Sequence, residues 1–265
     1  MITKEQALEL AQSLETAEQT QVQAELLSGK ITDMSFEDAY AIQDAWVKLK
    51  LAKGDQIIGH KIGLTSTVMQ RAFGIDEPDF GVLFQHMVHE HGAKLSTDEL
   101  IEPRIEAELA FKFHKDLPHS AKTIKEVLDC VEYIVPTLEL IDFRVKMSNA
   151  AGKNRTVKDT ISDNAANCAI IIGEARLPLD ADLPWAAATL RKNGIMEASG
   201  VAGAVLDHPV NSILWLNDKY AHLGRQVKAG QLVLAGSFIA PIPVSKGDEI
   251  EVDYNQFGKI ACSFI

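Results

Sequence analysis

The stretch PRIEAELAFKFHK, residues 103–115, contains two acids inside an otherwise apolar run. Its side chains alternate in character, and a period of two residues predicts a β-strand over residues 104–113, in which adjacent side chains face opposite sides. Glu106 and Glu108 then project from the same face. The other face is apolar and consists of Ile105, Ala107, Leu109 and Phe111. Because a buried carboxylate is costly without a partner, the glutamate face requires either solvent or a cation.

A divalent cation is one answer to this pair of like charges. Without a cation, the proximity of Glu106 and Glu108 raises the pKa of at least one carboxylate, whereas a metal ion keeps both ionised. A third acid, Glu139, lies in another apolar segment, EYIVPTLELIDF, residues 132–143. Oxygen ligands without cysteines suit a hard cation such as Mg²⁺, which keeps open positions for water or substrate. The alternative is a solvated strand face, which is the commoner explanation of a single E-x-E pattern.

The rest of the chain predicts an α+β fold. Capping-box spacings, Thr3 with Gln6 and Ser35 with Asp38, mark the starts of two helices. After Gly54 the pattern changes to short apolar segments separated by Gly, Pro and Asp, which predict strands. We expect strands at residues 57–64, 104–113, 132–141, 168–173, 231–240 and 249–254, and helices at residues 122–130 and 209–220.

These segments do not alternate in the way that a doubly wound sheet requires. We therefore expect a mixed, largely antiparallel β core with helices packed outside it. Residues 1–55 form a helical N-terminal region, and residues 56–265 form the β core that contains the active site. Because no linker, repeat or low-complexity segment divides the chain, we expect a single catalytic domain over residues 1–265.

The bulk composition favours a small-molecule partner. The net charge is −11 and the pI is about 5.2, so the basic surface typical of nucleic-acid and membrane-surface binders is missing. Cys130, Cys168 and Cys262 have unrelated spacings, which fit neither a disulfide framework nor a thiolate metal site. The N-terminus lacks a signal-peptide pattern, and no run approaches the roughly 18 apolar residues of a membrane span. We expect a cytoplasmic protein with reduced cysteines.

Two further segments contain candidate acid/base groups. Lys61 lies in the apolar segment IIGHKIGLTS, and burial lowers the pKa of a lysine towards the range useful for proton transfer. Asp79 lies in DEPDFGVL, at a turn into a strand. Both residues also have an ordinary explanation, because a strand lysine can extend to solvent and a turn aspartate often bonds to its own backbone.

The segments DTISDNAAN and LAGSF contain candidate substrate contacts. Ser162 lies in the first, and Gly236 with Ser237 lies in the second, where a glycine allows a ligand to approach the backbone. Turn capping explains the same residues. The histidine-rich segment HMVHEHG, residues 86–92, matches no helical zinc motif and predicts a surface loop.

Eight segments in this order resemble the fumarylacetoacetate hydrolase superfamily, and within it the 2-oxo-4-enoate hydratases and 4-oxalocrotonate decarboxylases of aromatic meta-cleavage pathways. The segments are GHKIGLTS, DEPDFGVL, EPRIEAELAF, PTLELIDFR, DTISDNAANCAIIIG, DHPVNSILWL, AGQLVLAGSF and KGDEIEVDYNQFGKI. They extend over nearly the whole chain. The resemblance implies a β-roll-like core and an Mg²⁺ or Mn²⁺ site formed by Glu106, Glu108 and Glu139, with no organic cofactor.

The same resemblance implies roles for other residues. Lys61 and Asp79 correspond to an acid/base pair, and Ser162 and Ser237 correspond to substrate contacts. The reaction it implies is that of a lyase that adds water at C4 of a 2-oxo-4-enoate acid, giving the 4-hydroxy-2-oxo acid in the catabolism of aromatic compounds. It also implies a homo-oligomer that can associate with a neighbouring enzyme of the pathway.

The loop NAAGKNRTVKDTISDNAAN, residues 149–167, refines this expectation. It resembles the loop in hydratases of 2-oxo-hept-4-ene-1,7-dioate, whereas the pentadienoate hydratases and the decarboxylases look shorter there. A substrate with a second carboxylate needs a cation at its far end, and an arginine can bind that carboxylate through two parallel hydrogen bonds. Arg155 is the expected contact, and a solvated basic loop is the alternative.

Other functions stay open on the sequence alone. Within the family, the alternatives are a 2-hydroxypenta-2,4-dienoate hydratase and a 4-oxalocrotonate decarboxylase. In a different class, the chain is a non-catalytic partner protein that binds a divalent ion.

Overall fold

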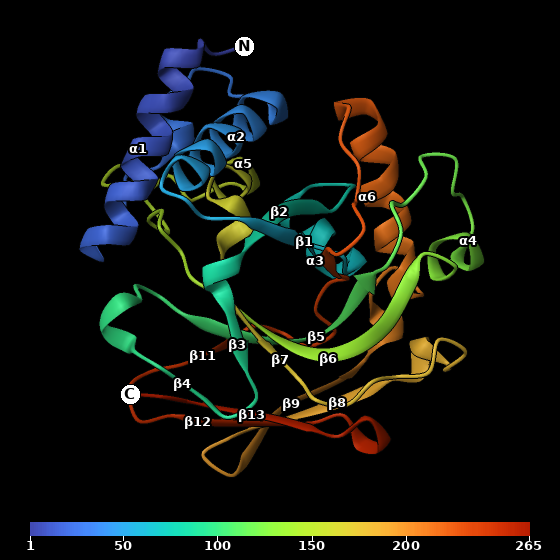
Figure 1. Ribbon diagram of the computed structural model, residues 1–265. Coiled ribbons are helices and arrows are strands. Elements are labelled where there is room, and N and C mark those ends of the chain that lie inside the picture. Colours follow the sequence, from blue (N-terminus) through green and yellow to red (C-terminus); the bar gives the residue numbers. More distant parts are fainter.

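The computed structural model describes residues 1–265, apart from the side chains of Met69, Ala72 and Phe73. Two β-sheets are stacked, with the helices above the larger sheet and the smaller sheet below it (Figure 1). The larger sheet has eight strands in the order β2-β1-β10-β5-β6-β7-β3, and β11 pairs with β5. The smaller sheet has the order β4-β13-β12-β8-β9. Strand pairs are antiparallel except β1–β10, β3–β7 and β4–β13, so the expected mixed, largely antiparallel core is confirmed.

The strands have the following bounds: β1 Ile57–Gly63, β2 Asp79–Phe84, β3 Val88–Glu90, β4 Ala93–Leu95, β5 Arg104–Phe113, β6 Val131–Ile141, β7 Asn167–Ile172, β8 Ala187–Lys192, β9 Ile195–Val201, β10 Leu232–Leu234, β11 Ile242–Pro243, β12 Glu249–Asp253 and β13 Lys259–Phe264. The helices are α1 Lys4–Thr20, α2 Phe36–Ala52, α3 Thr67–Phe73, α4 Ile124–Leu128, α5 Val157–Ser162 and α6 Pro209–Leu223. None of these helices has the length and apolar character needed to cross a membrane.

The two N-terminal helices begin at the predicted capping boxes. The Thr3 hydroxyl accepts from the Gln6 backbone N–H at 3.2 Å, and the Gln6 side chain accepts from the Thr3 N–H at 2.9 Å. Ser35 and Asp38 form the same pair of bonds at the start of α2. Each box satisfies backbone donors that a helix N-terminus otherwise leaves unpaired.

The predicted strand over residues 231–240 is wrong in its second half. Strand β10 ends at Leu234, and the chain then leaves the sheet. Gly236 has a φ of 117°, which a residue with a side chain rarely adopts, so the extended ladder cannot continue through it. The departing segment lines a cavity instead, as described below.

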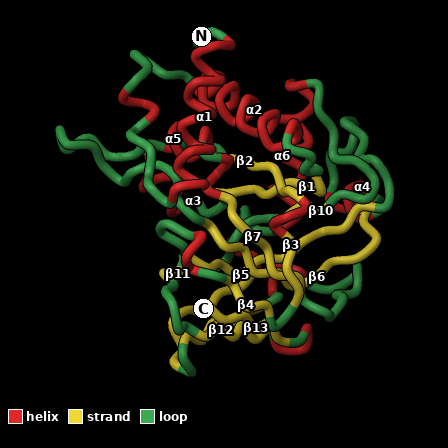
Figure 2. The backbone as a smooth tube through the Cα atoms, turned by 60° about the vertical axis from the view of Figure 1, so that its left-hand side comes forward, coloured by secondary structure: helices red, strands yellow, loops and turns green.

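The strands β3, β4, β11 and β13 and the β8–β9 hairpin were not predicted. Of these, β4, β8, β9 and β13 belong to the smaller sheet, in which Figure 2 labels β4, β12 and β13 at the lower end of the molecule. Their apolar patterns are short and interrupted by polar residues, which weakens a period-two signal. One continuous hydrophobic cluster nevertheless joins both sheets to the N-terminal helices, with Leu14 of α1, Trp46 of α2, Phe111 of β5 and Ile250 of β12 among its buried members. The three cysteines are free.

Candidate active site

Three carboxylates converge on adjacent strands of the larger sheet. In the antiparallel pair β5–β6, Glu106 lies directly opposite Glu139, and Glu108 lies opposite Thr137. Glu106 and Glu108 share one face of β5 because they are two residues apart. Each of the three glutamates offers an oxygen within 4.8 Å of the others, and this is the only such acidic, histidine or cysteine cluster in the part of the chain that the structure describes.

The electrostatics of this cluster fit a divalent cation. Burial, and then the charge of Glu139, raises the pKa of Glu106 to about 8. Burial and the same neighbour raise the pKa of Glu108 well above its usual value, and burial also raises the pKa of Glu139. Both oxygens of Glu139 are buried without a hydrogen-bond partner among the described residues. Two buried carboxylates, Glu108 and Glu139, and the half-buried Glu106 are therefore poorly compensated by protein groups alone, and an oxygen-binding cation such as Mg²⁺ or Mn²⁺ would supply the missing charge.

Among the residues that the structure describes, Lys61 of β1 forms the only ion pair with the cluster. Its ammonium lies 3.4 Å from Glu139 Oε1 and donates to the Ala165 carbonyl at 3.2 Å. Burial alone lowers the pKa of a lysine, but the charges of Glu139 and Asp79 outweigh burial and raise the pKa of Lys61 above its usual value. The expected lowering of the Lys61 pKa by burial is therefore wrong, because the carboxylates around the ammonium hold it charged inside the protein.

Asp79, the first residue of β2, is held beside Lys61 by the pairing of β2 with β1. Its backbone partner in β1 is Gly63. A Cβ on Gly63 would collide with the Asp79 carboxylate, so the glycine makes room for that carboxylate at the cavity. Asp79 is only 2% exposed, its Oδ1 has no hydrogen-bond partner among the described residues, and burial raises its pKa.

The carbonyl that holds Lys61 belongs to an unusual turn. Asn164, Ala165 and Ala166 are consecutive left-handed residues, with φ of 53°, 54° and 57°. This region is disfavoured for L-residues by about 1 to 2 kcal/mol each, so neighbouring contacts must hold the turn in place. The Asn164 side chain provides one such contact, because it accepts from the Val82 N–H at 2.7 Å and donates to the Val82 carbonyl at 2.9 Å.

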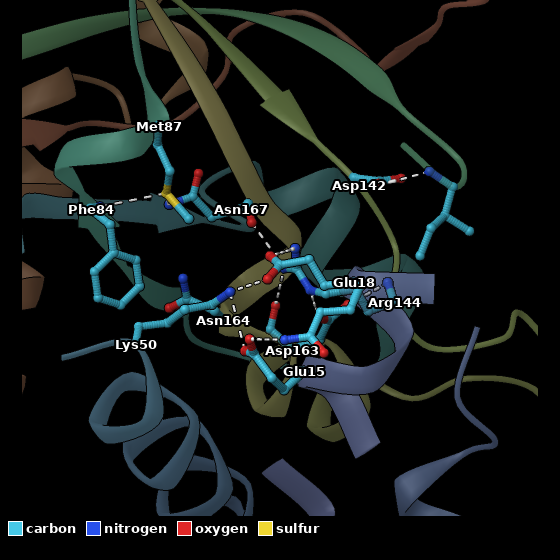
Figure 3. A network of polar contacts seen from close by, with 12 residues as sticks. Glu15, Glu18, Lys50, Phe84, Met87, Asp142, Arg144, Asp163, Asn164 and Asn167 are labelled. Carbon is cyan, nitrogen blue, oxygen red and sulfur yellow. Dashed lines mark hydrogen bonds and ion pairs between the residues drawn. The ribbon is translucent and has the colours of Figure 1, made fainter. Parts of the chain in front are cut away.

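A buried polar network anchors the residues on either side of this turn (Figure 3). Arg144 and Asp163 form an ion pair, and a second guanidinium nitrogen of Arg144 donates to the Asp163 and Asn167 carbonyls at 3.0 and 2.9 Å. Arg144 also lies 3.6 Å from Glu18 of α1, which in turn pairs with Lys50 of α2. The N-terminal helices are therefore connected to the turn that positions the lysine.

A cavity of about 530 Å³ opens onto these groups. Its lining includes Lys61, Asp79, Glu106, Glu108 and Ser237 among the residues expected at the site. This size suits a small organic ligand, since binding pockets for such ligands measure about 300 to 1,000 Å³.

The departing segment after β10 contributes Gly236 and Ser237. The Gly236 N–H donates to Glu108 Oε2 at 2.8 Å and so helps to orient one of the carboxylates. The Ser237 hydroxyl donates to the Ile239 carbonyl at 2.9 Å, at the edge of the cavity.

Arg155 and Ser162 lie in different surroundings. Arg155 lines the cavity, and its guanidinium carbon lies 3.8 Å from the centre of the Phe143 ring. Ser162, in α5, is fully buried away from the cavity lining, and its hydroxyl lies 2.8 Å from the Lys158 carbonyl and 3.4 Å from the Ala39 carbonyl. The structure therefore does not bring Ser162 to the other expected site residues.

The histidine-rich segment is dispersed around β3. His86 pairs with Asp55, and the His91 ring accepts from the Ala261 N–H at 3.1 Å. His86 and His91 therefore each contact a different partner and do not form a shared site.

Arg104 and Phe143 are among the cavity residues that were not anticipated, and Tyr254 is a buried neighbour of the site that was also missed. Arg104 has the same period-two spacing as the two glutamates of β5, so the strand pattern could have identified it. Phe143, which follows β6, had no comparable signal. The Tyr254 hydroxyl lies 3.2 Å from the Glu108 nitrogen and 2.8 Å from the Thr137 carbonyl, and it reaches them from the smaller sheet. Only the packing of the two sheets reveals this last contact.

Comparisons with known proteins agree along the whole chain. The 2-oxo-hept-4-ene-1,7-dioate hydratase of Escherichia coli is 44% identical over 258 residues, covering 97% of this chain and 97% of that protein. A 2-keto-4-pentenoate hydratase of Paraburkholderia xenovorans (strain LB400) is 34% identical over 264 residues, covering 99% and 96%. Among solved structures, the 4-oxalocrotonate decarboxylase from Pseudomonas putida G7, complexed with magnesium and adipate, has a TM-score of 0.94 at 31% identity, covering 100% and 99%. No protein-family model matches the chain.

Proposed function

This chain belongs to the 2-oxo-4-enoate hydratase and 4-oxalocrotonate decarboxylase group of the fumarylacetoacetate hydrolase superfamily, and from that premise we propose that it is a metal-dependent hydratase of 2-oxo-hept-4-ene-1,7-dioate. The product is the 4-hydroxy-2-oxo dioate. The convergence of the three glutamates beside Lys61, with Glu106 and Glu108 lining a cavity of matching size and Glu139 buried behind them, is the observation that carries this proposal. The 44% identity to a hydratase of this substrate supports the choice within the group.

Glu106, Glu108 and Glu139 are the proposed ligands of Mg²⁺ or Mn²⁺. A divalent cation bound there supplies Lewis acidity towards the 1-carboxylate and 2-oxo oxygens of the substrate, and no organic cofactor is needed. The complex of the Pseudomonas putida decarboxylase with magnesium supports this choice of cation.

Lys61 and Asp79 are the proposed acid/base pair. The Lys61 ammonium, held by the Ala165 carbonyl, donates a proton to C5 of the dienol form, and the amine left by that transfer accepts a proton from C3 of the keto form and so regains its charge. Asp79 orients or deprotonates the water that adds at C4, and its free Oδ1 is available to accept that proton. The raised pKa of Asp79, caused by burial, makes its carboxylate a stronger base than an exposed aspartate.

The remaining contacts are proposed to hold the substrate. Ser237 lines the cavity, Gly236 next to it donates to Glu108, and Arg155 provides a cation for a second carboxylate. Ser162 is supported only as an indirect contributor through α5, since its hydroxyl is occupied by backbone carbonyls. We also propose that residues 1–265 act as one catalytic domain in a cytoplasmic homo-oligomer, which can associate with a neighbouring pathway enzyme.

Decarboxylation is the second candidate, because the solved decarboxylase superposes on the chain at a TM-score of 0.94. The two reactions are distinguished by incubating the protein and Mg²⁺ with 2-oxo-hept-4-ene-1,7-dioate or 4-oxalocrotonate. Loss of the conjugated chromophore without CO₂ supports the hydratase, and release of CO₂ supports the decarboxylase. Absence of turnover with both substrates contradicts both proposals and favours a non-catalytic ion-binding protein.

The ligand assignment is tested with Glu106→Gln. We expect this variant to lose Mn²⁺ binding in a titration and to lose turnover with it. Glu132→Gln makes the same chemical change at an exposed position of β6 and should leave both properties unchanged. Retained metal affinity and full turnover in Glu106→Gln would contradict the assignment.

A further inference from the structure

Two arginines lie together over one aromatic ring at the cavity wall. The guanidinium carbon of Arg155 lies 3.8 Å from the centre of the Phe143 ring, and that of Arg104 lies 5.6 Å from the same centre. All three residues line the cavity that also contains Glu106 and Glu108. We call Arg104 and Arg155 the arginine pair. The charge of Arg104 opposes that of Arg155, so an anion bound beside both guanidinium groups would be stabilised by each of them.

Arg155 has no counter-ion among the residues that the structure describes. Its guanidinium donates to the Val145 carbonyl at 2.9 Å and stacks on Phe143, and neither partner carries a negative charge. Burial lowers the pKa of Arg155, and the charges of Asp163 and Glu102 oppose this shift without forming an ion pair with the guanidinium. A half-buried guanidinium that faces a cavity and has no direct ion pair is a binding group for an anion.

Arg104 is only partly satisfied. One of its terminal nitrogens donates to Glu102 Oε1 at 2.9 Å, whereas its Nε is buried without a hydrogen-bond partner. Glu102 is the acid paired with this arginine, so Glu102 and the arginine pair together carry a net charge of +1. That charge is matched by one additional carboxylate.

The position of Arg104 on β5 gives a length. Arg104 and Glu106 are successive residues on the same strand face, so their backbones are about 6.8 Å apart. In an extended seven-carbon 2-oxo acid, five C–C bonds of about 1.5 Å separate C2 from C7, a span of about 6 Å. The span from C2 to C7 is therefore about the distance between these two backbone positions, and both residues line the same cavity, whereas a five-carbon acid with one carboxylate has no group to place at Arg104.

We propose that Arg104 and Arg155 together bind the second carboxylate of a dicarboxylic 2-oxo acid, and that Arg104 sets the length of the chain that is accepted. This inference rests on the proposed function, because it takes the three glutamates as the end that holds the 2-oxo group. It adds a residue that determines specificity on β5, the strand that also carries Glu106 and Glu108. It makes the dioate, rather than the pentenoate, the preferred substrate.

The test uses binding, so that it does not depend on turnover. The saturated acids 2-oxoheptanedioate and 2-oxopentanoate lack the double bond that is hydrated, and each is titrated calorimetrically into the full chain with Mg²⁺. We expect the wild type to bind the dioate at least about tenfold more tightly than the monoacid. In Arg104→Gln, dioate affinity should fall about 10- to 100-fold, as expected for loss of a charge-assisted hydrogen bond, with monoacid affinity within about twofold of wild type.

A matched control variant, and a variant that is expected to strengthen dioate binding, complete this experiment. Arg176 also stacks on an aromatic ring, with its guanidinium carbon 3.9 Å from the Tyr133 ring centre, but it lies outside the cavity lining. Arg176→Gln should behave as the wild type with both acids. Glu102→Gln removes the negative charge beside Arg104 and should tighten dioate binding about threefold or more.

The outcomes separate the inference from the proposed function. Equal losses of affinity for both acids in Arg104→Gln would show that Arg104 affects the glutamates of β5 and does not bind a distal carboxylate. Unchanged affinity for both acids would also overturn the inference. Turnover is assayed separately with the unsaturated 2-oxo-4-enoate acids. If the wild type hydrates none of them but binds the saturated dioate preferentially and through Arg104, the hydratase proposal fails while the distal site stands. If hydration occurs without any dioate preference, the function stands and the inference fails.

Discussion

Lys61 illustrates how one residue acquires its properties from its neighbours. It is 4% exposed, yet the glutamates and Asp79 keep its ammonium charged, and the Ala165 carbonyl fixes where that charge lies. A lysine in this position can exchange protons with a substrate only within the cavity that it lines.

Replacing Lys61 should separate chemistry from metal binding. We expect Lys61→Met to lower kcat about 10²- to 10⁴-fold, the usual contribution of a positioned acid/base group, while the Mn²⁺ dissociation constant changes little. Steady-state kinetics and a metal titration measure the two effects. Lys112→Met, on the same sheet but outside the cavity lining, is the matched control. Normal turnover by Lys61→Met would exclude the assigned role.

His60 lies next to Lys61 but on the opposite face of β1, where its ring contacts Tyr220 of α6. Burial, opposed by the Gln231 side chain and reinforced by the charge of Arg225, lowers the pKa of His60 to about 4. The unfolded chain binds the same proton below about pH 6.5. Between these values the unfolded state holds more protons, so the free energy of unfolding falls as the pH falls.

This difference predicts a measurable loss of stability in acid. Between about pH 6.5 and pH 4, His60 should remove about 3 kcal/mol from the free energy of unfolding, measured by urea denaturation. His60→Gln should lose less stability than the wild type over this range. His119→Gln, at an exposed position, should keep the wild-type profile. Identical profiles for His60→Gln and the wild type would refute the prediction.

At the scale of elements, the smaller sheet supports the metal strands. Tyr254 follows β12 and is fully buried, and its hydroxyl contacts the Glu108 N–H and the Thr137 carbonyl, which face each other across β5 and β6. Its ring packs edge-on against Phe238, in the segment that leaves β10. One side chain thus connects the smaller sheet to the rung that holds Glu108.

Removing this hydroxyl should loosen the metal site without unfolding the protein. We expect Tyr254→Phe to weaken Mn²⁺ binding about tenfold, because groups that orient metal ligands typically contribute that much, and to leave KM at saturating metal nearly unchanged. Calorimetric titration of Mn²⁺ measures the first effect. Tyr133→Phe, on β6 beside Arg176, serves as the control. Unchanged metal affinity in Tyr254→Phe would show that the contact is only structural.

At the scale of the whole molecule, the proposed metal site exists only in the folded chain. Glu106 and Glu139 are 33 positions apart in the sequence and meet through the β5–β6 pairing. A cation that binds these carboxylates therefore binds the native state and shifts the folding equilibrium towards it.

Metal removal should accordingly destabilise the protein. With Mg²⁺ at about 100 times its dissociation constant, the free energy of unfolding should exceed that in excess chelator by about 2.7 kcal/mol. Thermal unfolding with and without chelator measures this difference. Glu139→Gln should show almost no response to Mg²⁺, and a wild-type response in that variant would place the ion elsewhere.

Local patterns in the sequence were sufficient where backbone neighbours decide the structure. The period of two in residues 104–113 determined β5 and its glutamate face, and the capping boxes determined the starts of α1 and α2. Here the interacting groups are only two to four residues apart, so their geometry follows from the chain itself. Arg104 follows the same spacing on β5, but only the position of the cavity shows that it lies at the site.

Long-range packing decided the rest. The left-handed turn at residues 164–166, the end of β10 before Gly236 and the reach of Tyr254 into the larger sheet have no local signal strong enough to predict them. Each costs free energy locally, through strained dihedrals or lost ladder bonds, and persists because a buried network or cavity wall compensates for it. The sequence by itself determined which side chains could bind a metal and a 2-oxo acid, and the tertiary structure decided that they meet, because only the burial of both sheets in one core brings distant strands together.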